Sequence, residues 1–170
     1  MTGTLYWITG LSGSGKTSIA SIVYNDLKKT KKNLVFLDGD AMRSILGLEN
    51  KGYDYDSRKK NGYVYSKLCK KLTEQGIDII FATIAMFHEI RDCNRTNIKN
   101  YVEIYIKTPL EFLIERDTKS LYNKSLTKKI NNVVGVDIKF EEPLNPDIVI
   151  VNNGKISIEE LAFDLLKKIK

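Results

Sequence analysis

The chain has 170 residues and a mass of 19.4 kDa, so we expect residues 1–170 to form a single domain. Hydrophobic residues make up 42% and charged residues 28%, which excludes an intrinsically disordered chain, and no apolar run is long enough to span a membrane. The 27 Lys and Arg residues exceed the 21 Asp and Glu residues, and the net charge of +6 favours an anionic ligand.

Apolar runs and segments of helical periodicity alternate along the chain. In chain order, the patterns predict a strand over residues 5–9, a helix from Lys16 to Leu27, a strand over 33–37, a helix over 59–75, strands over 77–84 and 102–106, a helix over 109–117, a strand over 147–151 and a helix over 157–169. Gly76 is predicted to end the second helix, Thr108 to cap the third, and Ser157 with Glu160 to form a capping box on the fourth.

This order of elements is typical of an α/β protein. Continuous apolar strands suit a parallel sheet that is covered on both faces, and short connections place the helices on those faces. We therefore expect a three-layer fold with a parallel five-stranded sheet. The polar segment 119–146 does not fit a strand or a helix, and a long structureless segment of this kind is typical of an active-site lid.

A phosphate-binding motif follows the first predicted strand. Residues 10–17 read G-L-S-G-S-G-K-T and match the P-loop pattern, between a strand and a helix as the motif requires. The glycines allow successive backbone amides to face one anion, Lys16 would contact the β- and γ-phosphates, and the Thr17 hydroxyl would face Mg²⁺. The sequence predicts that ATP with Mg²⁺ binds to Gly10, Ser12, Gly13, Ser14, Gly15, Lys16 and Thr17.

Two carboxylates, Asp38 and Asp40, follow the second predicted strand. Ligands of open α/β sheets bind at the carboxyl ends of the strands, where the P-loop also lies. One carboxylate would orient or deprotonate an acceptor hydroxyl, and the other, with Thr17, would hold Mg²⁺ or its water; the residues alone leave open which does which. The alternative is a simple Asp-Gly turn. With Lys16, these two carboxylates are the candidate catalytic residues.

Arginines and one aromatic residue follow the same strand ends. Arg43, Arg58 and Arg91 are interpreted as ligands of an anionic acceptor, because guanidinium groups bind phosphoryl oxygens in a bidentate manner. Phe87 is interpreted either as an exposed ring that stacks on a nucleobase or as a core residue. His88, the single histidine, is interpreted as a polar surface residue rather than a catalytic one.

The remaining composition narrows the class of protein. The chain has no N-K-x-D guanine signature, so a small-molecule kinase is favoured over a GTPase. Cys69 and Cys93 lack metal-binding spacing, which predicts free thiols in the cytoplasm. The lysines are scattered in pairs rather than gathered in one block, which favours a solvated surface over a nucleic-acid-binding arm. We expect no nucleic-acid or membrane partner.

The ordered motifs resemble those of the adenosine 5′-phosphosulfate (APS) kinase family nearly from end to end. They include the residues 6–17, L-D-G-D at 37–40 with Arg43, G-Y at 52–53 with Arg58 and Asn61, T-P-L-E at 108–111, and G-V-D at 135–137. The resemblance implies an ATP-dependent kinase of a ribose 3′-hydroxyl, Asp40 as the base, Arg43, Arg58, Asn61 and Lys119 as acceptor ligands, residues 119–146 as a lid, and a homodimer.

The departures from the family pattern are concentrated at the acceptor. Ala85 stands where some members of the family have a Ser that can carry a phosphoryl group. His88 replaces the family's Arg after the Phe, and Val133 replaces its second base-stacking Phe. The acceptor pocket is predicted to be lined by Ile84, Ala85, Phe87, Val133 and Val134. The pattern is similar to a branch that phosphorylates cytidine diphosphoramidate in capsule biosynthesis.

Three alternative functions remain open from the sequence. The first is an APS kinase of sulfate assimilation with an altered pocket, which preference for APS as acceptor would reveal. The second is a non-catalytic ATP-binding regulator, which the intact Lys16, Thr17, Asp38 and Asp40 disfavour. The third is a nucleic-acid-binding protein that uses the +6 charge, which would show a steep salt dependence of binding and no turnover.

Overall fold

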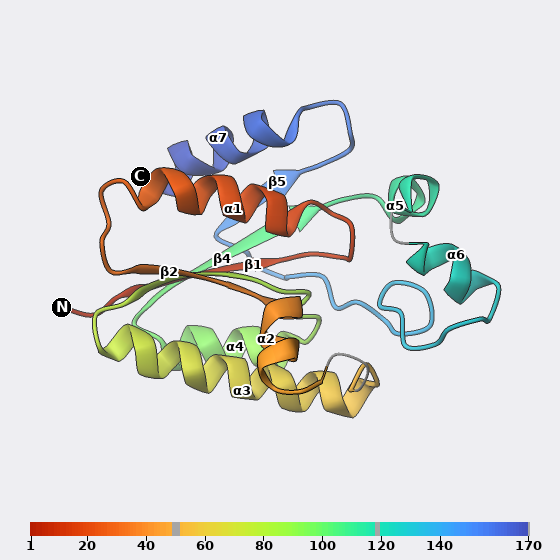
Figure 1. The fold of residues 1–170 in the computed structure, drawn as a ribbon, viewed down its shortest axis with the longest axis horizontal. Helices are drawn as coiled ribbons and strands as arrows, with labels where there is room; N and C mark the ends of the chain where they lie inside the picture. Colours follow the sequence, from red (N-terminus) through yellow and green to blue (C-terminus); the bar gives the residue numbers. More distant parts are fainter. Residues whose placement is uncertain (49–51, 118–119, 170) are drawn as a thin grey trace.

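The fold is built on a parallel five-stranded sheet (Figure 1). The computed structural model describes residues 1–48, 52–117 and 120–169. The strands are β1 (Thr4–Thr9), β2 (Leu34–Asp38), β3 (Asp78–Ala82), β4 (Asn100–Lys107) and β5 (Ile148–Val151), in the spatial order β2-β3-β1-β4-β5. All four pairings are parallel, and in the central register Leu5 lies between Ile79 and Tyr101. The five predicted strands are confirmed, with ends that differ by a few residues.

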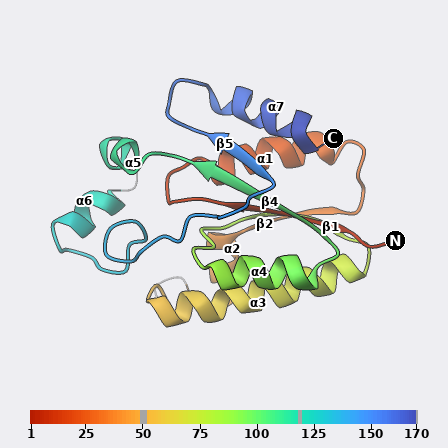
Figure 2. The same cartoon turned by 180° about the vertical axis from the view of Figure 1, so that it is seen from behind.

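Helices cover both faces of the sheet, as predicted (Figures 1 and 2). Helices α1 (Lys16–Leu27) and α7 (Ile158–Ile169) lie on one face, and α3 (Tyr55–Glu74) and α4 (His88–Asn97) lie on the other. Successive β1 side chains supply both cores: Leu5 and Trp7 pack with α3 and α4, whereas Tyr6 and Ile8 pack with α1 and α7. The three-layer α/β fold is therefore confirmed.

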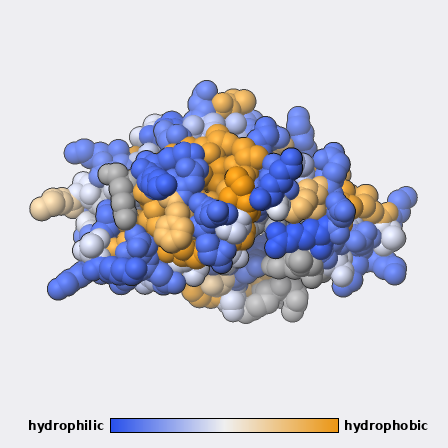
Figure 3. Space-filling model, turned by 90° about the horizontal axis from the view of Figure 1, so that it is seen from above, coloured by the Kyte–Doolittle hydropathy of each residue, from blue (hydrophilic) through white to orange (hydrophobic). Residues whose placement is uncertain are grey.

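Figure 3 shows the side of the molecule formed by α1 and α7. Hydrophilic residues cover most of this face, and apolar atoms gather near its middle. Among the described residues, none of the helices combines the length and apolar character that crossing a bilayer requires. Cys69 and Cys93 are both free thiols.

Capping interactions explain where two predicted helices begin. The helix predicted from Lys59 begins at Tyr55, because the Asp54 carboxylate accepts a 2.9 Å hydrogen bond from the Ser57 amide and caps the helix. The capping box on α7 is confirmed: the Glu160 amide donates to the Ser157 hydroxyl, and the Glu160 carboxylate accepts from the Ser157 amide.

The predicted Thr108 cap is wrong. Helix α5 (Leu110–Arg116) is preceded by Pro109 as its N-cap, with no side-chain hydrogen bond. The Thr108 hydroxyl is buried, and it has no hydrogen-bond partner within the described part of the chain.

Three helices were not predicted from the sequence: α2 (Gly39–Ile45), α4 and α6 (Leu121–Leu126). Helix α4 escapes a search for apolar periodicity because its buried residues are Ile90, Arg91 and Asn94, two of them polar. Helix α6 lies within the segment 119–146, which is therefore not structureless. The part of that segment with α6 lies beyond the carboxyl ends of the strands (Figure 1), as expected of a lid, but whether it moves stays a prediction.

Candidate active site

The P-loop joins β1 to α1 and has the backbone geometry that phosphate binding requires. Gly13 and Gly15 have φ angles of 76° and 95°, in the left-handed region that favours glycine. At Gly10, a Cβ atom would lie 2.6 Å from the Ile106 carbonyl oxygen, so a side chain cannot fit there. The Lys16 Nζ donates a 2.6 Å hydrogen bond to the Leu11 carbonyl, which places the ammonium group over the loop.

Two residues from distant elements hold the P-loop. The buried Asn152, just after β5, donates a 2.9 Å hydrogen bond to the Ser14 carbonyl, and the Tyr122 hydroxyl on α6 donates a 2.8 Å hydrogen bond to the Ser12 carbonyl. The Ser14 hydroxyl is itself buried and has no hydrogen-bond partner among the residues that the structure describes. Sequence reasoning did not single out Asn152 or assign a role to Tyr122. An Asn directly after an apolar strand, at the edge where ligands bind, was the available signal.

The predicted magnesium ligands lie together. The Thr17 hydroxyl donates a 2.7 Å hydrogen bond to one carboxylate oxygen of Asp38, and the other Asp38 oxygen accepts from the Asp40 amide at 2.9 Å and caps α2. A hydroxyl and a carboxylate side by side at the start of a P-loop helix are hard oxygen donors, which Mg²⁺ prefers. Asp40 is exposed in the first turn of α2, which follows the carboxyl end of β2 as the P-loop follows that of β1.

Two predicted acceptor ligands, Arg43 and Arg58, meet at the ring of Tyr53. Their guanidinium carbons lie 4.0 Å and 5.4 Å from the ring centroid. Arg43 donates to the Gly52 carbonyl at 2.7 Å, and Arg58 donates to the carbonyls of Tyr53 at 2.6 Å and Asn132 at 3.0 Å. Burial and the neighbouring Arg43 charge lower the pKa of Arg58 to about 10, so the Arg58 guanidinium is still cationic at neutral pH. Two adjacent cations favour an anionic ligand here.

Asn61 also lies near this pair, one turn along α3 from Arg58. Its side chain is 9% exposed, and its amide nitrogen has no hydrogen-bond partner within the described residues. An unpaired buried donor is costly to a folded protein, and a ligand that accepts this hydrogen bond would remove the cost. The predicted role of Asn61 as an acceptor ligand therefore fits the structure.

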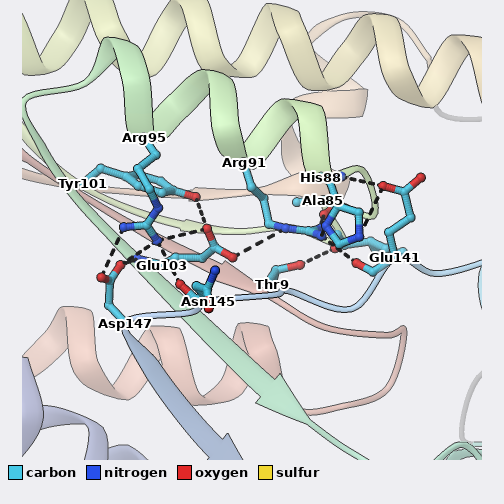
Figure 4. Close-up of polar contacts among 11 residues, drawn as sticks. Thr9, Ala85, His88, Arg91, Arg95, Tyr101, Glu103, Glu141, Asn145 and Asp147 are labelled. Atoms are coloured by element: carbon cyan, nitrogen blue, oxygen red, sulfur yellow. Dashed lines mark hydrogen bonds and ion pairs between the residues drawn. The ribbon is translucent and has the colours of Figure 1, made fainter.

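The loop between β3 and α4 is held in a strained conformation. Ala85 has a φ angle of 42°, which is unfavourable for a residue with a Cβ atom. The Thr9 hydroxyl donates to the Ile84 carbonyl, and Arg91 donates to the Ala85 carbonyl (Figure 4). These two side chains keep the loop in this shape.

The interpretation of Phe87 as an exposed ring is wrong. Phe87 is 2% exposed and belongs to the core cluster that also contains Val133 and Val134, which are 3% exposed each. The ring of Tyr55 lies edge-on against it, with centroids 4.9 Å apart. The structure thus places the three predicted base-binding residues in one buried cluster, with Tyr55 packed against Phe87.

The interpretation of Arg91 as an acceptor ligand is also wrong. Arg91 is 2% exposed, and its guanidinium donates to the Glu141 carbonyl at 2.6 Å, contacts His88 Nδ1 at 2.8 Å and lies 3.5 Å from the Glu103 carboxylate (Figure 4). Burial raises the pKa of Glu103, and the charges of Arg91 and Arg95 oppose that shift. Arg91 is therefore part of a buried ion-pair network that joins α4, β4 and the segment before β5.

The predicted site residues converge at one edge of the sheet. The carboxyl ends of β1 and β2 lead into the P-loop and α2, and the start of α3 lies at the same edge. These elements carry Asp38, Asp40, Arg43, Arg58 and Asn61, and the loop with Ile84 and Ala85 follows β3. Lys119 lies outside the described residues. The roles of the individual residues toward bound ligands stay predictions.

This combination of a parallel sheet, a P-loop with its lysine, and paired carboxylates defines a P-loop kinase, a phosphotransferase. The chain matches the model of the adenylylsulphate kinase family over residues 2–151, and it belongs to that family.

Known proteins with two different activities are similar to this chain. The cytidine diphosphoramidate kinase of Campylobacter jejuni is 47% identical over 97% of this chain and 95% of the relative. A probable adenylyl-sulfate kinase of Pyrococcus abyssi is 33% identical over 100% of this chain and 97% of the relative. The structure of the Mycobacterium tuberculosis APS kinase in complex with AMPPNP and APS superimposes with a TM-score of 0.86, at 30% identity, and covers 99% of this chain and 98% of that one.

Proposed function

We propose that this chain is an ATP-dependent nucleotide 3′-kinase whose acceptor is cytidine diphosphoramidate, in the biosynthesis of capsule O-methyl phosphoramidate. The observation that carries this proposal is the 47% identity to the Campylobacter jejuni cytidine diphosphoramidate kinase over nearly the full length of both chains. The departures from the APS kinase pattern at Ala85, His88 and Val133 support a changed acceptor, because the P-loop and its carboxylates are intact.

The residues at the sheet edge fit the chemistry of this transfer. The P-loop amides and Lys16 would bind the β- and γ-phosphates, and Asp40 would orient the ribose 3′-hydroxyl and accept its proton. The 3′-oxygen then forms a bond to the γ-phosphorus while the bond from that phosphorus to the β–γ bridging oxygen breaks, and ADP leaves. Mg²⁺, held by Thr17 and Asp38, would neutralise phosphate charge.

Arg43, Arg58 and Asn61 would bind the anionic 5′ group of the acceptor. Arg43 follows Asp40 by three residues on α2, and Arg58 and Asn61 lie on α3, where the Asn61 amide nitrogen has no partner among the described residues. Ala85 has no hydroxyl, so a phosphoryl group cannot be carried at that position. The cytoplasmic location and the homodimer expected from the sequence stay predictions.

The second candidate is an APS kinase of sulfate assimilation. It is favoured by the adenylyl-sulfate kinase relative at 33% identity and by the TM-score of 0.86 to an APS kinase in complex with APS. Both candidates share the ATP site and the 3′-hydroxyl chemistry, and they differ in the base and the 5′ group of the acceptor.

The deciding experiment measures ADP formation by the purified chain with cytidine diphosphoramidate and with APS, side by side at matched concentrations. We expect faster turnover of the cytidine compound, with ³¹P NMR placing the new phosphate on the ribose 3′ position. Faster turnover of APS would overturn the acceptor assignment in favour of the second candidate. No ADP formation with either compound would overturn both.

A further inference from the structure

The loop between β3 and α4 follows the carboxyl end of β3, at the edge of the sheet that carries the P-loop. It contains Ile84 and Ala85, which are predicted to line the acceptor pocket, and Ala85 has the unfavourable φ angle of 42°. Such a backbone conformation persists only where the surrounding structure enforces it. The contacts that hold this loop therefore determine the shape of that part of the pocket.

Three successive carbonyl groups of this loop each accept a hydrogen bond from a different part of the chain. The pairs are the Thr9 hydroxyl with Ile84, the Arg91 guanidinium with Ala85, and the Glu141 amide with Met86. Arg91 lies on α4, and Glu141 lies in the segment before β5. Thr9 differs from these two donors because it belongs to β1, the strand that leads into the P-loop (Figure 4).

Thr9 is the last residue of β1, directly before Gly10, the first residue of the P-loop, and it is fully buried. The backbone ladder between β1 and β3 extends to Thr83, whose amide donates a 2.9 Å hydrogen bond to the Ile8 carbonyl. The Thr9 hydroxyl continues this connection by one further hydrogen bond, to the Ile84 carbonyl. One residue is thus joined to the P-loop through the backbone and to the loop after β3 through its side chain.

The chemistry of phosphoryl transfer gives this link a consequence. The 3′-oxygen of the acceptor must lie in line with the γ-phosphorus of ATP, and a displacement of about 1 Å can lower the rate about 100-fold. The acceptor pocket must therefore keep a fixed place relative to the P-loop. The Thr9 hydroxyl provides a direct link between the two, whereas Arg91 and Glu141 tie the same loop to α4 and to the segment before β5.

We infer that Thr9 is a positioning residue of the phosphoryl transfer, because its hydroxyl holds the loop after β3 in place relative to the P-loop. This inference rests on the proposed function, in which Ile84 and Ala85 contact the acceptor. Thr9 acts through Ile84: its buried hydroxyl fixes the Ile84 carbonyl, and the neighbouring Ala85 backbone keeps its strained shape. A residue of equal size without the hydroxyl would fill the same space and leave the loop free to relax.

Thr9→Val tests this role, because valine keeps the branched shape and lacks the hydroxyl. Steady-state kinetics are measured with ATP and with whichever acceptor the wild type turns over, cytidine diphosphoramidate or APS. We expect kcat at saturating substrates to fall about 10- to 100-fold, since the acceptor is no longer held in line with the γ-phosphate. The KM for ATP should stay close to that of the wild type, because the P-loop itself is unchanged.

Two controls separate positioning from folding. Thr9→Ser and Thr9→Ala form a second pair that differs only in the hydroxyl: Thr9→Ser should keep kcat near the wild-type value, and Thr9→Ala should lose it as Thr9→Val does. This pair keeps the test decisive if valine disturbs the fold. Thr73→Val is the matched control, because Thr73 is 1% exposed and its hydroxyl donates a 3.0 Å hydrogen bond to the Lys70 carbonyl, near the end of α3. It should leave kcat unchanged.

A purely structural role has a different outcome. If Thr9 only stabilises the fold, Thr9→Val lowers the temperature of thermal unfolding, while kcat per ATP-binding site, counted by calorimetric titration, equals that of the wild type. A raised KM for ATP with unchanged kcat would assign Thr9 to the support of the P-loop. Either result would overturn the inference and leave the proposed function standing on wild-type turnover. Absence of wild-type turnover with either acceptor would overturn the proposed function itself, and the inference with it.

Discussion

The carboxylate of Glu141 accepts a 2.6 Å hydrogen bond from the backbone amide of His88, the first residue of α4 (Figure 4). The Glu141 amide donates to the Met86 carbonyl at 3.1 Å, and its carbonyl accepts from Arg91 at 2.6 Å. One residue of the segment 119–146 thus binds the loop between β3 and α4 with its side chain and both backbone groups. The part of that segment around Glu141 is an anchor, and any lid motion must occur before it.

Glu141→Gln tests this anchor. The substitution keeps the shape of the side chain and removes the negative charge at the α4 N-terminus, so we expect the free energy of unfolding to fall by about 0.5–2 kcal/mol in urea titrations. Glu142→Gln is the matched control, because the neighbouring carboxylate forms an exposed 3.2 Å ion pair with Lys107, far from the α4 N-terminus in its contacts. Equal losses in the two variants would contradict the capping role.

Arg91→Met tests the buried ion-pair network. Removing Arg91 leaves the buried Glu103 carboxylate with one cationic partner, Arg95, and the Tyr101 hydroxyl, and we expect a loss of about 3–5 kcal/mol in the free energy of unfolding. Arg95→Met should cost less, because the Arg95 side chain is 42% exposed and water replaces part of what it supplies. If Arg91→Met unfolds at the same urea concentration as the wild type, Arg91 is not a structural residue.

Asp40→Asn tests the proposed base. The amide cannot accept the proton of the 3′-hydroxyl, so we expect kcat to fall by roughly 10²–10⁴-fold. ATP binding, measured by calorimetry, should survive. Asp38→Asn should act differently: Asp38 faces Thr17, so its loss should weaken Mg²⁺-dependent ATP binding. Near-normal turnover in Asp40→Asn would assign the base to another residue.

Asn152→Ala tests the support of the P-loop. The substitution leaves the buried Ser14 carbonyl without its side-chain donor, and we expect a loss of about 1–3 kcal/mol in stability together with a raised KM for ATP. The next residue, Asn153, is exposed and its side chain accepts a hydrogen bond from the Lys155 amide, so Asn153→Ala should leave the KM for ATP unchanged. A shared effect of both variants would mean that the loop does not depend on Asn152.

The ionisation of Asp147 is expected to account for part of the loss of folding stability in acid. Desolvation raises its pKa, but hydrogen bonds from Arg95 and from the Glu103 amide outweigh that effect, and the net pKa lies below the ordinary 3.8. A carboxyl whose pKa is lower in the folded state stabilises the protein above the unfolded pKa. That contribution is lost as the pH falls through the folded value. Below pH 3.8 the wild type should therefore lose more stability than Asp147→Asn, as measured by urea unfolding at successive pH values; parallel losses would contradict this.

Local patterns in the sequence were enough to predict most of the framework and the nucleotide site. The five strands are mainly apolar runs, interrupted in β4 by Glu103, and α1 and α7 have clear apolar stripes. The P-loop could be recognised because its phosphate-binding groups are backbone amides and two side chains within eight consecutive residues. The Thr17–Asp38 pair followed from a general property of parallel sheets, whose carboxyl ends meet at one edge.

The tertiary structure alone decided the roles of residues whose chemistry permits two uses. A guanidinium can bind a phosphate or close a buried ion pair, and Arg91 does the second because Glu103 and the Glu141 carbonyl reach it. A Phe after a strand can face a ligand or the core, and Phe87 lies in the core because Tyr55 packs over it. Burial and pairing depend on partners that lie far away along the chain, 50 residues away in the case of Arg91 and Glu141, and local periodicity carries no information about such distances.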